Sequence, residues 1–155
     1  MCYISNSLCD FEFHDTEFWD GNVSECRFIA NVKFLNIHSN AEQNPFDKDM
    51  EIEQAQIVFD GFYIISYEHG RAWKTDENGE RYTDEPQVIL QGEAAVRAFK
   101  EQLNDKIVIF DFDKKDDTAH FIDAMGNDPF FTLLFSFDSV TVSWDAYKKA
   151  AWYAE

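Results

Sequence analysis

Polar and hydrophobic residues alternate over short stretches of the chain, a pattern typical of β-strands with one face in a core. In the first stretch, Phe11 and Phe13 alternate with Glu12 and His14. Later runs are rich in Phe, Ile and Val and cover 27–38, 52–67, 106–112, 130–137 and 140–144. An Asp-Gly pair interrupts the second of these runs and favours a bulge or turn, so that run is one long strand or two shorter ones.

Two turn signals indicate how some strands are joined. Asn78-Gly79 lies between Trp73 and Tyr82 and is the strongest hairpin signal, because both residues accept the positive φ angles of a two-residue turn. Asp138-Ser139 predicts a second tight turn, which would join the last two strands directly.

Helical periodicity occurs in two places. Ala95, Phe99 and Leu103 recur every three to four residues within 92–104, which predicts an amphipathic helix lying on a sheet. The segment 145–153 predicts a second helix, since its first residue is an aspartate that can cap the N-terminus and two lysines lie toward the C-terminal end.

These patterns predict an α+β fold with a mainly antiparallel sheet of about seven or eight strands and two helices, one near 92–104 and one near 145–153. The 155 residues contain no repeat and no obvious linker, so we expect a single domain over 1–155. No apolar stretch approaches the roughly 18–20 residues that a membrane-spanning helix needs.

Charge adds an expectation about partners. Thirty acidic residues against 13 basic ones give a formal net charge of −17. Such a chain repels nucleic acids and anionic membranes and attracts basic partners, so we expect a basic protein partner, no nucleic acid and no membrane. A simpler interpretation is that the acidity only keeps an aromatic-rich chain soluble. The oligomeric state is left open.

Cysteine usage and the N-terminal segment bear on the compartment. Cys2, Cys9 and Cys26 form no CxxC pair, and the first twenty residues lack the basic and apolar regions of a signal peptide. We therefore expect a cytoplasmic protein with reduced thiols.

A strand-end aspartate motif is the strongest enzymatic candidate. The segment 107–113 ends in Asp-Phe-Asp and resembles the nucleophile motif of haloacid-dehalogenase-type phosphatases, but Lys114-Lys115 stands where that motif has Gly-Thr. Four carboxylates here could bind a partner or a divalent cation, or form a solvated strand end: Asp111, Asp113, Asp116 and Asp117. A metal-dependent enzyme would need His14 or His120 in the same pocket. No motif for binding a cofactor is present, and we expect neither a cofactor nor an enzyme.

The predicted hairpin is the first candidate for a binding surface. It combines aromatic residues, which anchor partners, with carboxylates, which steer and pair with basic side chains. An exposed hairpin without a function is the simpler alternative. The candidate partner-binding residues here are Trp73, Asp76, Glu77, Glu80, Tyr82, Asp84 and Glu85.

Three further motifs carry a family resemblance: Phe11-Glu-Phe-His-Asp15, Phe28-Ile-Ala-Asn-Val-Lys-Phe34 and Ile57-Val-Phe-Asp-Gly-Phe62. They resemble bacterial immunity proteins of polymorphic-toxin and contact-dependent growth inhibition systems, over roughly residues 11–67. The resemblance implies a small, cytosolic, β-rich protein that binds one cognate toxin domain, often a basic nuclease, and blocks its active site. It brings no catalytic residues and no map of the binding site.

The sequence therefore predicts an immunity-type inhibitor of a basic toxin domain, expected to be a nuclease. One alternative is an acidic mimic of nucleic acid that occupies DNA-binding proteins. Another is a divalent-metal-dependent enzyme that uses Asp111 and Asp113.

Overall fold

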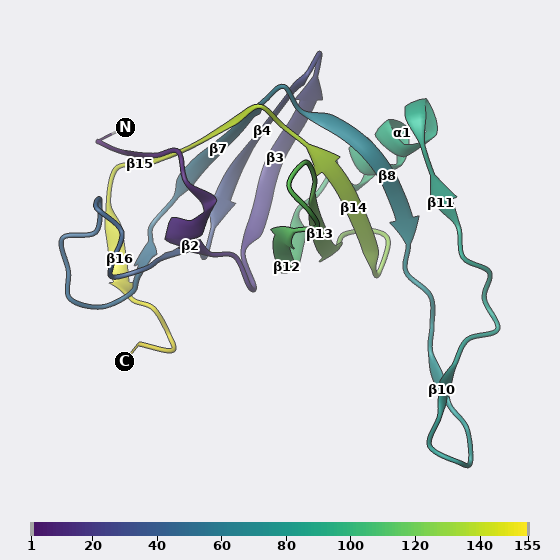
Figure 1. The fold of residues 1–155 in the computed structure, drawn as a ribbon. Coiled ribbons are helices and arrows are strands. Elements are labelled where there is room, and N and C mark those ends of the chain that lie inside the picture. The colour runs from purple at the N-terminus through teal and green to yellow at the C-terminus, as the bar shows by residue number, and fades with distance from the viewer. Residues whose placement is uncertain (1, 155) are drawn as a thin grey trace.

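The computed structural model describes residues 2–154 and is dominated by antiparallel β-structure (Figure 1). Within that range the chain forms 16 β-strands, one α-helix and one short 3-10 helix, η1 (Leu8–Asp10). The prediction of seven or eight strands and two helices is therefore wrong, although the sheet is antiparallel as expected. Several strands are only two or three residues long, too short to show an alternating pattern in the sequence.

The main sheet has ten strands in the order β1-β15-β7-β4-β3-β12-β13-β14-β8-β11. In chain order these strands are β1 (Tyr3–Ser5), β3 (Glu17–Ser24), β4 (Arg27–Lys33), β7 (Ala55–Asp60), β8 (Tyr63–His69), β11 (Ile89–Leu90), β12 (Ile107–Lys114), β13 (His120–Met125), β14 (Phe131–Ser136) and β15 (Ser139–Trp144). A four-stranded sheet, in the order β16-β6-β5-β2, lies beside one end of it. Its strands are β2 (Phe11–Glu12), β5 (Asn36–Ile37), β6 (Met50–Ile52) and β16 (Tyr147–Ala150).

The main sheet curls around a core of aromatic side chains. Phe59 on β7 and Phe135 on β14 have ring centroids 5.7 Å apart, although four strands separate β7 from β14 in the sheet. The helix α1 (Gly92–Gln102) packs against β8 and contributes Phe99, which contacts Phe28 at 5.4 Å. The largest fully buried side chains include Trp144, Tyr67, Phe18, Phe28, Phe59, Phe99, Phe131 and Phe135.

Two strand connections lie next to each other at a corner of the sheet. The chain passes from β7 to β8 at Gly61, which has a φ of +68°, and from β14 to β15 at Asp138. The N–H of Asp138 donates to the carbonyl of Asp60 at 2.8 Å, so the two connections lie side by side. The tight connection predicted at Asp138-Ser139 is present, since only two residues separate β14 from β15. The two strands do not form a hairpin, because β15 pairs with β7 and β1 while β14 pairs with β13 and β8.

The two predicted helices had different outcomes. The first is present as α1, with Ala95 and Phe99 buried. The second is absent, and its residues form β16 and a turn, with Tyr147 opposite Ile52 in β6. Pairing with β6 overrides a local composition that is compatible with a helix. No described helix has the length and apolar character needed to span a lipid bilayer.

A hairpin arm, residues 70–87, projects from the body of the molecule (Figure 1). It contains β9 (Lys74–Thr75) and β10 (Arg81–Tyr82), which pair only with each other, and Gly79 has the expected positive φ. The hairpin predicted at Asn78-Gly79 is therefore confirmed. None of its side chains is buried in the core.

Candidate functional site

The outer face of the sheet, formed by β12, β13, β14 and β8, carries a line of carboxylates. On β13, β14 and β8 the residues Ile122, Leu133 and Tyr67 are buried in the core, so their neighbours along each strand lie on the opposite face. On β12 a register irregularity between Ile109 and Asp111 shifts the alternation, so Asp111 lies opposite Asp123 on the outer face although Ile109 is buried. Three carboxylates and one threonine are direct cross-strand neighbours there, in the order Asp111, Asp123, Thr132 and Glu68. We call Asp111, Asp123 and Glu68 the acidic row.

The acidic row is not neutralised by the chain itself. Asp123 accepts a hydrogen bond from the Thr132 hydroxyl at 2.5 Å, and Glu68 accepts one from Gln87 at 3.1 Å. Among residues 2–154, none of the three carboxylates forms an ion pair with a lysine or arginine. Like charges directly opposite on neighbouring strands destabilise a sheet, by about 0.2–1 kcal/mol per pair. We therefore expect the Asp111–Asp123 pair to weaken the fold.

A broad cleft separates the hairpin arm from the outer face. This arm cleft has a volume of about 780 Å³, and its lining includes Glu68, Asp123 and Thr132 on one side and Trp73 on the other. Phe130, 56% exposed, also lines it. The arm cleft therefore combines two members of the acidic row with exposed aromatic rings and with Arg71 and Arg81 of the arm.

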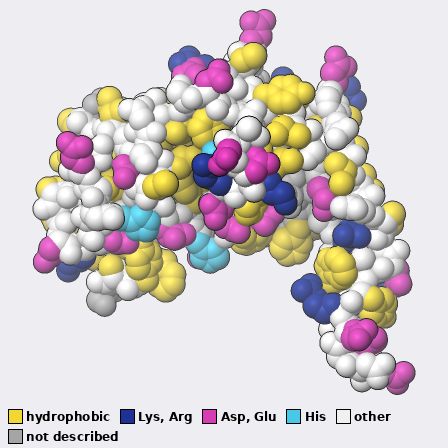
Figure 2. All heavy atoms as spheres, viewed as in Figure 1, with side chains coloured by type: hydrophobic (Ala, Val, Ile, Leu, Met, Phe, Trp, Pro, Cys, Tyr) yellow, Lys and Arg dark blue, Asp and Glu magenta, His cyan; other side chains and the backbone are white. Residues whose placement is uncertain are grey.

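The arm itself is mixed in charge, as Figure 2 shows by its intermixed basic, acidic and hydrophobic side chains. The guanidinium groups of Arg71 and Arg81 lie 5.0 and 5.5 Å from the centre of the Trp73 ring. Lys74 pairs with Asp84 at 2.8 Å. The hairpin was predicted to present aromatic and acidic side chains to a partner. In the structure, the ring of Trp73 already contacts two arginine side chains of the same arm.

Other carboxylates of the arm serve its own backbone. Asp76 accepts hydrogen bonds from the N–H groups of Asn78 and Glu80, and Glu85 accepts one from the N–H of Ala72. Two other predicted residues, Glu77 and Tyr82, are exposed on the same hairpin.

The second predicted acidic group is divided by the structure. Asp111 belongs to the acidic row, and Asp113 lies two residues farther along β12, opposite Phe121. Asp116 and Asp117 lie in the turn between β12 and β13. The N–H and hydroxyl of Thr118 hold the pKa of Asp116 below its usual value, with a further hydrogen bond from the N–H of Ala119.

The arrangement needed for a metal-dependent enzyme is only partly present. His14 and Asp111 line the same cleft, whereas His120 contacts Phe112 and Phe135 in the aromatic core. Burial lowers the pKa of His120, and the charge of Lys114 lowers it further. Within residues 2–154, no group of three or more His, Cys, Asp or Glu side chains is arranged to hold a metal ion.

A second cleft lies at the other end of the outer face, beside the C-terminal residues. This C-terminal cleft has a volume of about 430 Å³. It is lined by two carboxylates, two imidazoles and three aromatic rings: Glu12, Asp111, His14, His38, Phe110, Trp152 and Tyr153. Asp111 belongs both to this cleft and to the acidic row, and Phe110 lines both this cleft and the arm cleft.

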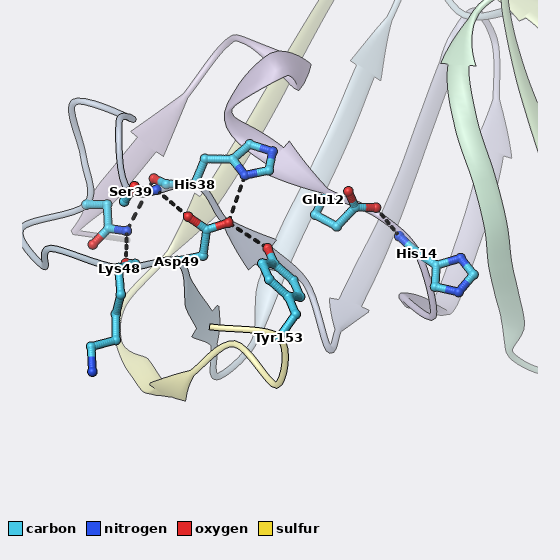
Figure 3. A network of polar contacts seen from close by, with 8 residues as sticks. Glu12, His14, His38, Ser39, Lys48, Asp49 and Tyr153 are labelled. Carbon is cyan, nitrogen blue, oxygen red and sulfur yellow. Dashed lines mark hydrogen bonds and ion pairs between the residues drawn. The ribbon is translucent and has the colours of Figure 1, made fainter. Parts of the chain in front are cut away.

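Asp49 fixes one wall of the C-terminal cleft. Its carboxylate accepts hydrogen bonds from the Tyr153 hydroxyl at 2.7 Å, the Ser39 N–H at 2.7 Å and His38 Nδ1 at 3.0 Å (Figure 3). Burial alone would raise the pKa of Asp49, but these hydrogen bonds outweigh burial and hold the pKa below 3.8. Burial raises the pKa of Tyr153, as does its bond to Asp49, so the phenol is neutral.

The opposite wall is ordered by His14. Its Nδ1 lies 2.7 Å from the carbonyl oxygen of Phe110, and its backbone N–H donates to Glu12 at 3.0 Å. The Phe110 carbonyl raises the pKa of His14, and the nearby carboxylates of Asp15, Glu12 and Asp111 raise it further.

Sequence reasoning missed most of this region. Because 145–153 was predicted to be a helix, Trp152 and Tyr153 were not predicted to be site residues. No local sequence pattern indicates that His38 contacts Asp49. Asp123 and Glu68 lie on predicted strands, but only the strand register shows that they are neighbours of Asp111. A scan against protein-family models and searches of curated proteins and of solved structures found no match to this chain.

Proposed function

We propose that this chain is an immunity-type inhibitor that binds a basic toxin domain through its outer face and blocks the active site of that domain. The observation that carries the proposal is the acidic row. Asp111 and Asp123 face each other, and among residues 2–154 neither forms an ion pair with a lysine or arginine, an arrangement that is expected to weaken the fold and that a cationic partner would relieve.

Two other features support a protein partner. The acidic row lies between two clefts with exposed aromatic side chains, including Phe130 and Trp152, and such rings commonly anchor protein interfaces. The net charge of −17 would steer a basic domain toward this surface and speed association by about 10–10³-fold. Cys2, Cys9 and Cys26 are free and exposed, which suits the cytoplasm as the place of action.

The test is affinity capture with a matched pair of charge variants. The outer-face variant carries Asp111→Asn, Asp123→Asn and Glu68→Gln. The control variant also loses three carboxylates, through Glu25→Gln, Glu42→Gln and Asp47→Asn, which are exposed and line neither the arm cleft nor the C-terminal cleft. Each protein is used to capture partners from lysates of bacteria that express toxins, at about 50 and 200 mM salt.

We expect the unchanged protein and the control variant to retain one basic protein in near-equal molar amount at both salt concentrations, and the outer-face variant to lose it. The captured protein should lose its activity when mixed in equal amount with the unchanged chain. Equal capture by both variants would contradict the proposal. Capture of many DNA-binding proteins, all released at the higher salt, would instead favour a nucleic-acid mimic.

A further inference from the structure

The C-terminal cleft has the geometry of a site for a small cation. The rings of Trp152 and Tyr153 have centroids 5.5 Å apart and planes at 88°, so they form two perpendicular walls. Phe110 lines the same cleft. Aromatic rings attract cations over their faces, and tryptophan does so most strongly.

The Tyr153 wall of this cleft is held in place before any ligand binds. Tyr153 is fixed through its hydroxyl to Asp49, and the preceding backbone is fixed where the N–H of Ala151 donates to the Asp49 carbonyl at 2.9 Å. Ala151 is fully buried. A preorganised site loses little conformational entropy on binding, which favours its use as a binding site.

Charge and hydrogen-bonding capacity select the kind of ligand. Glu12 and Asp111 supply two carboxylates, and among residues 2–154 no lysine or arginine lines the cleft. His14 and His38 each use Nδ1 within the protein, for the Phe110 carbonyl and Asp49 respectively. Nε2 of His14 lies 3.7 Å from the Asp15 carboxylate. With its proton on Nδ1, the His38 ring leaves Nε2 as an acceptor for an N–H group.

We infer that the C-terminal cleft binds an organic cation, a guanidinium or ammonium group held between aromatic rings and carboxylates. The group could belong to an arginine or lysine side chain of a protein partner, or to a free amine. The inference deepens the proposed function by naming what this end of the outer face recognises, and it rests on that function only for the source of the cation.

The test is an NMR titration of the ¹⁵N-labelled protein at about pH 8, above the ordinary imidazole pKa of about 6.5. Three probes are used: N-acetyl-arginine methylamide, its neutral isostere N-acetyl-citrulline methylamide, and spermidine. The indole N–H signal of Trp152 is assigned as the one lost in Trp152→Ala. This side chain is 66% exposed, so the variant is expected to fold.

We expect the arginine probe to shift the Trp152 indole signal and the citrulline probe to bind about tenfold more weakly. Trp152→Ala and Glu12→Gln should each weaken arginine binding by about tenfold, while Trp73→Ala, at the other exposed tryptophan, should leave it unchanged. Tighter binding of the arginine probe than of spermidine identifies a protein side chain as the source, and the reverse identifies a free amine.

Equal binding of arginine and citrulline probes would overturn the inference, as would shifts at Trp73 instead of Trp152 or no shifts with any probe. Those results would leave the capture experiment unaffected, because its outer-face variant also changes Asp123 and Glu68, which lie outside this cleft. The two proposals can therefore fail separately.

Discussion

Asp111 and Asp123 are directly opposed carboxylates on neighbouring strands. We expect Asp111→Asn to raise the free energy of unfolding by about 0.2–1 kcal/mol, because it removes the repulsion between directly opposed carboxylates. Urea unfolding at low salt measures this change. In the capture experiment the same substitution should weaken partner binding.

Asp113→Asn is the matched control, since Asp113 lies on the same strand and face but opposite Phe121. It should leave the stability nearly unchanged. If the two variants were equally stabilised, the gain would come from lowering the overall negative charge and not from the opposed pair.

The hydroxyl of Tyr153 is the second residue with a measurable effect. Tyr153→Phe removes the hydrogen bond to Asp49 and should lower the free energy of unfolding by about 1 kcal/mol at neutral pH. The pKa of Asp49 is lowered in the folded protein, so its stabilising contribution is present above the ordinary carboxyl pKa of 3.8 and is lost as the pH falls through the lower folded value. The difference between the two proteins should therefore shrink below about pH 3.8.

Urea unfolding at a series of pH values measures this dependence. Tyr63→Phe is the control, because Tyr63 is 65% exposed and its hydroxyl makes no hydrogen bond within residues 2–154. That variant should match the unchanged protein throughout. A loss of stability in Tyr153→Phe that persisted undiminished at low pH would assign the effect to packing and not to Asp49.

Among the elements, the corner at Gly61 is the most demanding. A Cβ at this position would overlap the side chain of Asp138, and the residue already has a positive φ. Gly61→Ala should therefore destabilise the fold by about 1–3 kcal/mol. Gly79→Ala is matched in backbone conformation, with a φ of +82°, but a Cβ there meets no atom within 4 Å.

Thermal unfolding of the two glycine variants distinguishes the cost of the positive φ from the cost of steric overlap with Asp138. Gly79→Ala carries the backbone cost alone, in an arm that contributes nothing to the core, and its midpoint should change little. Comparable losses in the two variants would mean that backbone conformation, and not contact with Asp138, makes the corner sensitive.

The elements also show how far the sequence leads. The helix α1 and the Asn78-Gly79 hairpin depend on local signals, and both were predicted correctly. The strand β16 depends on a partner about 100 positions away, so its local composition was misleading. The same reason explains the site: Asp111 could be found in the sequence, but its neighbours Asp123 and Glu68 required the register of four strands.

At the scale of the whole molecule, we expect that the rest of the chain folds without the hairpin arm. We expect a variant in which residues 71–86 are replaced by a short Gly-Ser linker to keep its thermal midpoint within about 4 °C, because no residue of the arm is buried. The flanking backbone stays together through the hydrogen bond from the His69 N–H to the Val88 carbonyl. Circular dichroism during heating measures the midpoint.

Replacing the loop 40–48 is the contrasting control, since its residues Ala41 and Asn44 are buried and Asn44 donates to the carbonyls of His38 and Lys48. That change should lower the midpoint by more than the arm replacement does. Unfolding of the armless variant at room temperature would show that the arm is part of the folding unit.

The pairing of β1 with β15 also has a consequence for the time course of folding. Asn6 and Val140, 134 positions apart, are joined beside these strands by a hydrogen bond. During synthesis on the ribosome, β1 and one edge of β7 remain unpaired until β15 has left the exit tunnel. Contacts so distant in sequence make folding slow, and the unpaired edge of β7 is exposed to other chains in the meantime. Chaperone demand should therefore be greatest before β15 has paired with β1 and β7.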